Sequence, residues 1–145
     1  MNNQQKMLML GNIGEKLIRY LAQEEGCEVR EYPSLYDSEK DLTINGKTCE
    51  VKTQVPFFVE DAFTVKKNQI RKCKNVDILL FVESPNKGNV IRVYSVPKEK
   101  REFRHRKTKD GRDMYLLDKS DMNMIYSVTD SNLANEMRQN SNSSW

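Results

Sequence analysis

The chain has 145 residues, of which 31% are charged and 37% hydrophobic, and its formal net charge is +3 at pH 7. This length is enough to bury a core without disulfide bonds, and no apolar run approaches the roughly 20 residues that a membrane-spanning helix needs. The start, MNNQQKMLML, lacks the apolar run and the cleavage site of a secretory signal. We therefore expect a cytoplasmic protein with no membrane contact. We expect one domain over residues 1–139 and a flexible polar tail over 140–145.

The cysteine pattern argues against a disulfide-bonded protein and against a zinc-binding one. Cys27, Cys49 and Cys73 are odd in number and have no CxxC spacing. In a chain without a secretory signal, such cysteines are expected to be reduced thiols in the core. His105 is the sole histidine, so a zinc site built from cysteine and histidine is disfavoured.

The first half of the chain predicts a helix, a strand and a hairpin. Apolar residues at helical spacing predict an amphipathic helix over 5–25, which Gly26 ends. Gly11 and Gly14 lie inside this helix and weaken it by up to about 1 kcal/mol each relative to alanine, which indicates that another segment packs closely there. A strand over 28–32, a loop over 33–38 and a hairpin over 41–53 follow.

The second half of the chain alternates strands and helices. Strands are predicted over 62–65 and 76–82, with a short basic helix over 66–74 between them. Further strands are predicted over 90–96 and 114–117, the latter after an Asp110-Gly111 turn. A final helix over 130–139 is capped by Asp130 or Ser131. This order predicts an α/β (α+β) fold with a central mixed sheet flanked by helices.

Basic side chains gather in two segments. Residues 98–112 hold eight Lys or Arg against three acids, and residues 66–74 hold five with no acid. Such clusters are typical of proteins that bind the phosphate backbone of nucleic acids. Charge runs alone are equally compatible with two solvated faces that bind nothing.

The segment 41–53, DLTINGKTCEVKT, carries the strongest local signal. Asn45-Gly46 between two alternating runs predicts a two-residue type I′ turn. The register of this turn places Asp41 directly opposite Glu50, with Cβ atoms about 4.5–5.5 Å apart. Because side chains alternate along a strand, the residues of the hairpin divide between its two faces. Lys52 and Gln54 lie beside Glu50, and Leu42, Ile44, Cys49 and Val51 lie on the core side.

Two opposed carboxylates repel each other unless something compensates their charge. Mg²⁺ prefers oxygen ligands and is usually held by one or two carboxylates together with waters and substrate phosphates. Lys52, one position along, could reach a phosphate oxygen or a metal-bound water. The hairpin is therefore predicted to be a metal and phosphate site. The alternative is a plain amphipathic hairpin in which Lys52 neutralises Glu50.

From about residue 7 to residue 96 the chain resembles the PD-(D/E)XK nuclease superfamily. Asp41 matches the aspartate of the motif, and Glu50-Val51-Lys52 matches its E-x-K. Glu15 fits the place of the first-helix glutamate that many members use. Lys40 departs from the motif, which has proline there. In size and organisation the chain looks most like small Holliday-junction-resolvase-like or restriction-endonuclease-like members.

The resemblance implies a restriction-endonuclease-like core and a Mg²⁺-dependent DNA endonuclease, with Mn²⁺ as a substitute metal. Asp41, Glu50, Glu15 and the main-chain carbonyl of Val51 would hold the metal. Lys52 would orient or deprotonate the attacking water, and Gln54 would complete the catalytic set near the phosphate. The implied partners are duplex or branched DNA, cut in a structure-selective way, and a second copy of the chain in a homodimer.

The DNA contacts are expected from the two basic segments, through Lys66, Lys67, Gln69, Arg71, Arg101, Arg104, Arg106 and Lys107. His105 is expected to be a solvated loop residue. Three alternatives remain open. They are a catalytically inactive nucleic-acid-binding module on the same fold, a restriction or repair nuclease, and an adaptor whose basic arm binds an acidic protein.

Overall fold

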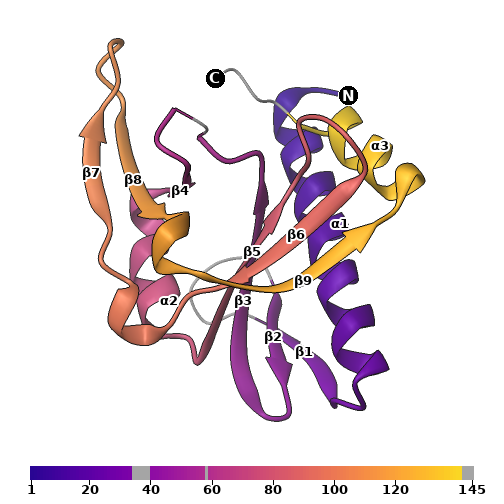
Figure 1. The fold of residues 1–145 in the computed structure, drawn as a ribbon. Coiled ribbons are helices and arrows are strands. Elements are labelled where there is room, and N and C mark those ends of the chain that lie inside the picture. Colours follow the sequence, from indigo (N-terminus) through magenta and orange to yellow (C-terminus); the bar gives the residue numbers. More distant parts are fainter. Residues whose placement is uncertain (34–39, 58, 142–145) are drawn as a thin grey trace.

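The computed structural model describes residues 1–33, 40–57 and 59–141, with the backbone alone at residues 40 and 41 (Figure 1). The expected loop over 33–38 and the expected tail over 140–145 therefore fall mostly outside the described residues. The longer described elements, in chain order, are α1 (Asn3–Glu24), β1 (Val29–Pro33), β2 (Lys40–Ile44), β3 (Lys47–Gln54), β4 (Ala62–Val65), α2 (Ile70–Asn75), β5 (Ile78–Glu83), β6 (Val90–Ser95), β7 (Arg104–Lys107), β8 (Asp113–Asp118), β9 (Asn123–Thr129) and α3 (Ser131–Gln139). Short 3-10 helices are η1 (Lys67–Gln69), η2 (Lys98–Lys100) and η3 (Lys119–Asp121).

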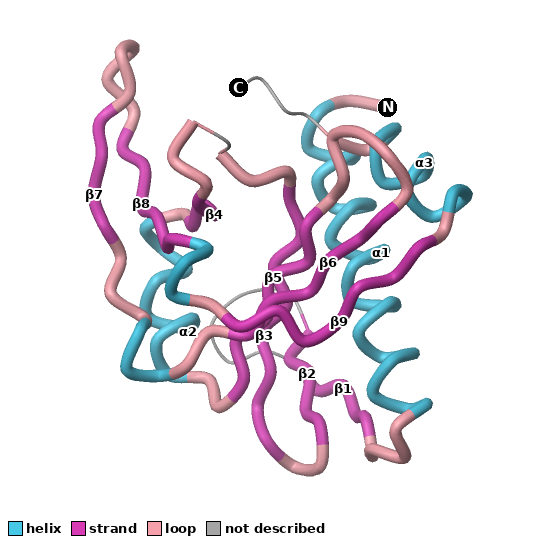
Figure 2. The backbone as a smooth tube through the Cα atoms, in the orientation of Figure 1, coloured by secondary structure: helices cyan, strands magenta, loops and turns pink. Residues whose placement is uncertain are grey.

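The described strands form two sheets. The larger sheet has the order β1-β2-β3-β5-β6-β9, and it is mixed because β3 and β5 run parallel while its other neighbours run antiparallel. The smaller, antiparallel sheet has the order β4-β8-β7. Helices α1 and α3 cover one face of the larger sheet, and α2 and the smaller sheet lie on its other side (Figure 2). The mixed sheet flanked by helices is confirmed, and the smaller sheet is an element that the sequence did not predict.

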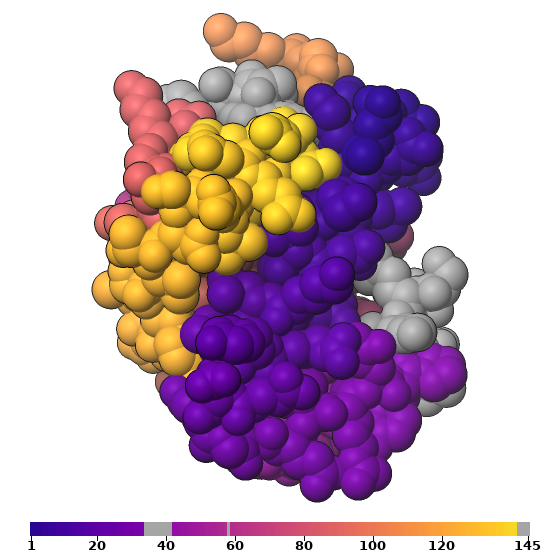
Figure 3. All heavy atoms as spheres, turned by 90° about the vertical axis from the view of Figure 1, so that its right-hand side faces the viewer, coloured from indigo at the N-terminus to yellow at the C-terminus, as the bar shows by residue number. Residues whose placement is uncertain are grey.

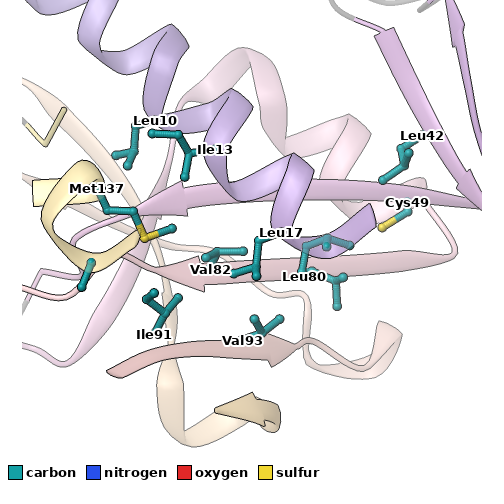
Figure 4. Packing of buried hydrophobic residues seen from close by; sticks show 12 residues of the cluster. Leu10, Ile13, Leu17, Leu42, Cys49, Leu80, Val82, Ile91, Val93 and Met137 are labelled. Carbon is teal, nitrogen blue, oxygen red and sulfur yellow. The ribbon is translucent and has the colours of Figure 1, made fainter. Parts of the chain in front are cut away.

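The first core lies between α1, α3 and the larger sheet. Leu10, Ile13 and Leu17 of α1 pack toward Val82 of β5 and its neighbours on β6 (Figure 4). Met137 of α3 closes the same core, and α3 lies beside the N-terminal part of α1 (Figure 3). Helix α1 begins with a capping box between Asn2 and Gln5, and Asp130 caps α3 as predicted.

Gly14 lets α1 approach β3 closely. A Cβ atom at this position would lie 1.7 Å from the Oγ1 atom of Thr53, whereas a Cβ atom at Gly11 would meet nothing within 4 Å. Close packing predicted from the two glycines is therefore confirmed at Gly14 and absent at Gly11.

The second core joins the smaller sheet and α2 to the far face of the larger sheet. The ring of Phe63 on β4 stacks on that of Phe81 on β5, with centroids 4.8 Å apart, and contacts Tyr94 on β6. Cys73 of α2 is fully buried in this core. Burial raises the pKa of the Cys73 thiol to about 11 and that of Cys49 to about 12. All three cysteines are free thiols, although Cys27 is only half-buried.

The hairpin prediction is confirmed where its residues are described. Asn45 and Gly46 have φ values of 51° and 78°, which a type I′ turn requires. The register pairs Leu42 with Cys49, Thr43 with Thr48 and Ile44 with Lys47. Leu42 and Cys49 are buried against α1, with Ile44 and Val51 partly buried beside them.

Two strands were not predicted. The β7 strand consists of Arg104, His105, Arg106 and Lys107, all exposed, so it shows no alternation of apolar residues. The β9 strand lies at the edge of the larger sheet and is mostly exposed. Among the described helices, none has the length and apolar character needed to cross a bilayer.

Candidate active site

Strand β3 carries the Glu50-Val51-Lys52 motif in the middle of the larger sheet. It pairs with β2 through Lys47, Thr48 and Cys49, and with β5 from Cys49 to Gln54. Beyond the Leu42–Cys49 pair, the next residue on β2 is Asp41 and the next on β3 is Glu50. The carboxylate of Asp41 lies outside the described side chains, so its position opposite Glu50 stays a prediction.

Glu50 is buried, with 7% of its surface exposed, and two lysines hold its carboxylate. The Nζ atom of Lys52 lies 3.6 Å from Oε1, and that of Lys72 on α2 lies 3.0 Å from Oε2. Lys72 is itself only 6% exposed. Because a buried charge is costly unless it is paired, the two ammonium groups explain how the carboxylate is accommodated.

Lys52 is oriented by a side chain from η1. Its Nζ atom donates a hydrogen bond to the Oε1 atom of Gln69 at 2.7 Å. A lysine ammonium has three donors, and the separation from Glu50 is an ion-pair distance beyond hydrogen-bonding range. Gln69, which was expected to contact DNA, thus holds Lys52 through its side-chain oxygen.

Glu15 is close enough to Glu50 to feel its charge, and its direct partner is Glu31 on β1. Burial, the hydrogen bond to Glu31 and repulsion from the Glu31 charge raise the pKa of Glu15 to about 7, with a smaller contribution from Glu50. Arg19 opposes this effect and donates to the Oε1 atom of Glu31 at 2.7 Å. The structure therefore adds Glu31, which the sequence did not indicate, to the surroundings of Glu15.

Gln54 joins the two sheets. Its side-chain amide donates to the carbonyl of Thr64 on β4, and its oxygen accepts from the amide N–H of Thr64 at 2.7 Å. The hydroxyl of Thr64 donates to the same oxygen. The carboxamide that was expected beside the phosphate is thus engaged with the backbone of the smaller sheet.

The oxygen atoms around Glu50 are of the kind that a hard divalent cation binds. Glu50 and Glu15 offer carboxylate oxygens, which Mg²⁺ prefers, and the Val51 carbonyl belongs to the same strand as Glu50. Among the fully described residues, no group of three His, Cys, Asp or Glu side chains is close enough to hold a metal ion. The Asp41 carboxylate is outside that set, and it is the ligand that the prediction needs most.

The basic segment over 66–74 lies next to this site. Lys66, Lys67 and Arg71 are exposed, and the contact of Gln69 with Lys52 places the segment against β3. These three cations are therefore exposed on a segment that packs against β3.

Most of the second basic segment is already engaged within the protein. Arg104 pairs with Asp118 at 2.8 Å and with Glu60 at 3.1 Å. Arg106 also pairs with Glu60 and lies over the ring of Phe57. Lys107 is exposed at the end of β7.

Arg101 was expected to contact DNA, and this expectation was wrong. Its side chain is buried, with 4% of the residue exposed. The guanidinium lies within hydrogen-bonding distance of five main-chain carbonyls, one just after β6 and four between the end of α2 and the start of β5. These carbonyls belong to Val96, Cys73, Lys74, Val76 and Asp77. A group held in this way stabilises the fold and presents no charge to a ligand.

His105 was expected to be a solvated loop residue; it is exposed, but it belongs to strand β7 and not to a loop. It lies on β7, with its Nε2 atom 2.7 Å from the carboxylate of Asp113 and its ring 5.0 Å from that of Tyr115. The hydrogen bond to His105 is the main cause that lowers the pKa of Asp113. This exposed pair lies on the hairpin of β7 and β8, and Asp113 also feels the charge of Lys67.

Comparisons of the chain with protein-family models, with curated proteins and with solved structures found no significant match.

Proposed function

We propose that the chain is a Mg²⁺-dependent DNA endonuclease with a restriction-endonuclease-like core. The observation that supports it best is the arrangement on β3. Glu50 and Lys52 lie side by side, and Lys52 is oriented by Gln69 from a segment that exposes four cations, Lys66, Lys67, Arg71 and Lys74. A structure-selective, Holliday-junction-resolvase-like enzyme would act as a homodimer, because two symmetric strands need two sites.

In this proposal Glu50, Asp41, Glu15 and the Val51 carbonyl would hold the divalent cation. When bound, the cation supplies charge neutralisation at the phosphate and lowers the pKa of a water. Lys52 has N–H donors beyond the one that Gln69 takes. These donors would orient a phosphate oxygen or the attacking water, and their charge would stabilise the negative charge that develops on the phosphate.

The test is cleavage of branched, flapped, linear and single-stranded DNA with Mg²⁺ or Mn²⁺. The variants Asp41→Asn and Lys52→Met should each lose roughly 10²-fold or more of the cleavage rate. They should still bind DNA, and a denaturant titration should show that they are folded. Wild-type cleavage rates in a purified Asp41→Asn variant would overturn the proposal.

A second candidate is a catalytically inactive nucleic-acid-binding module on the same fold. It is favoured by the two ion pairs of Glu50, because Lys52 and Lys72 lie at the carboxylate oxygens that a metal ion would need. This candidate predicts binding that weakens steeply with salt, and no cleavage of any substrate in the same panel with either metal. The wild-type chain alone distinguishes the two candidates.

A further inference from the structure

We propose that Lys72 is a resident counter-ion of Glu50 that competes with a divalent cation for this carboxylate, so that Lys72 sets the cation affinity of the site. The inference rests on the proposed function, because it assigns a role to a residue of the same site. Lys72 belongs to the basic segment over 66–74. It is buried, whereas the other lysines and the arginine of this segment are exposed.

The contact that supports this role is the ion pair on the inner side of Glu50. The Nζ atom of Lys72 lies 3.0 Å from Oε2, and both side chains are under one-tenth exposed. An ammonium and a divalent cation both seek carboxylate oxygens, and Mg²⁺ binds its oxygen ligands at about 2.0–2.1 Å. A cation on this carboxylate would therefore lie close to the Lys72 charge, and the two positive charges would repel each other strongly at a site shielded from water.

The two lysines of Glu50 are not equivalent. Lys52 is 20% exposed in its side chain, lies 3.6 Å from the carboxylate and is held by Gln69. Lys72 is closer to the carboxylate and more deeply buried, and it comes from α2. Lys52 is thus placed to meet a ligand from solvent, whereas Lys72 compensates the Glu50 charge from inside the protein.

A purely structural ion pair predicts a different outcome. If Lys72 only stabilises the fold, neutralising it lowers stability and leaves cation affinity unchanged. If it competes with the cation, neutralising it lowers stability without metal and raises cation affinity. The two effects are measured separately, and neither measurement depends on catalysis.

The experiment is calorimetric titration of the full chain with MgCl₂ alone, without DNA. Lys72→Gln should bind Mg²⁺ about tenfold more tightly than wild type, because one opposing charge at the carboxylate is removed. Lys74→Gln, an exposed lysine on the same helix with the same change of charge, should stay within about twofold of wild type. Lys72→Arg, which keeps the charge, should not gain affinity.

Thermal unfolding supplies the second measurement. Without metal, Lys72→Gln should unfold at a lower temperature than Lys74→Gln, and MgCl₂ should raise its unfolding temperature more than that of wild type. Lys72→Met keeps the buried aliphatic volume and replaces Lys72→Gln if that variant does not fold. Mg²⁺ binding that is unchanged, weaker or undetectable in the neutral variants would overturn the inference. Cleavage by the wild-type chain and its loss in Lys52→Met test the proposed function independently of this result.

Discussion

The Arg101 side chain donates hydrogen bonds to main-chain carbonyls around the second core. Its guanidinium reaches carbonyls at the end of β6 and along the segment from Cys73 to Asp77. A buried carbonyl left without a partner costs about 1–3 kcal/mol. The Arg101 side chain therefore stabilises the segment between α2 and β5.

Replacing Arg101 with methionine should lower the free energy of unfolding by about 2–4 kcal/mol, since several buried carbonyls lose their donor. Lys100→Met, an exposed position one residue earlier, should change it by less than about 0.5 kcal/mol. Urea unfolding monitored by circular dichroism measures both. Equal effects of the two substitutions would show that the Arg101 contacts carry little stability.

Glu15 makes stability depend on pH in the absence of divalent cations. Its pKa is raised from 4.5 to about 7 in the folded protein, mainly by burial. The folded state therefore binds more protons than the unfolded state between these values, so stability falls as pH rises from about 4.5 through 7. Above that range the folded state holds a charged Glu15 that it disfavours.

Glu15→Gln should remove this slope. Relative to wild type, the variant should gain more stability at pH 8 than at pH 5, as measured by urea unfolding in a chelating buffer. Glu24→Gln, an exposed acid on the same helix, should show no such difference between the two pH values. A wild-type curve parallel to that of Glu15→Gln would contradict the assigned cause.

At the scale of elements, the contact of α1 with β3 determines how the first helix is placed over the sheet. Gly14→Ala puts a Cβ atom 1.7 Å from Thr53 Oγ1, so either α1 or Thr53 must shift, and we expect a loss of roughly 1–3 kcal/mol. Gly11→Ala meets nothing within 4 Å and should gain up to about 1 kcal/mol from helix propensity. Thermal unfolding of the two variants should therefore change in opposite directions, and a shift of the same sign would refute the close approach.

The elements that the sequence predicted are those whose signals are local. The turn at Asn45-Gly46 determines the hairpin register, and alternation along β3 places Glu50 and Lys52 on one face. The smaller sheet was missed because β4 pairs with β8, about fifty residues further along, and β7 has no apolar pattern to reveal it.

The same distinction applies to the candidate site. The sequence predicted Glu50 and Lys52 as candidate site residues from the E-x-K motif, and Glu15 from its position in the first helix. Lys72 and Gln69 were not assigned their contacts, since both depend on how α2 and η1 pack on the larger sheet. Arg101 was misassigned because a run of charges does not show which of its members is buried.

At the scale of the whole molecule, the exposed cations Lys66 and Lys67 are expected to dominate DNA binding. Changing both to glutamine should weaken binding at every DNA sequence. It should also reduce the slope of log affinity against log salt by about 0.9 for each phosphate that the protein no longer neutralises. Lys16→Gln with Lys87→Gln makes the same change of net charge at exposed positions on other elements. Fluorescence anisotropy of labelled DNA, measured across salt concentrations, compares the two double variants. Equal slopes for both would show that Lys66 and Lys67 are not part of the DNA interface.

The parallel pairing of β3 with β5 requires a long connection between the two strands, and the candidate site depends on that connection. The chain that connects these strands, residues 55–77, supplies Gln69 to Lys52 and Lys72 to Glu50. A chain that has formed only the first helix and the hairpin therefore has the motif but neither of these partners. Whatever disrupts the connection over residues 55–77 therefore removes both partners of the motif, even where the hairpin itself stays intact.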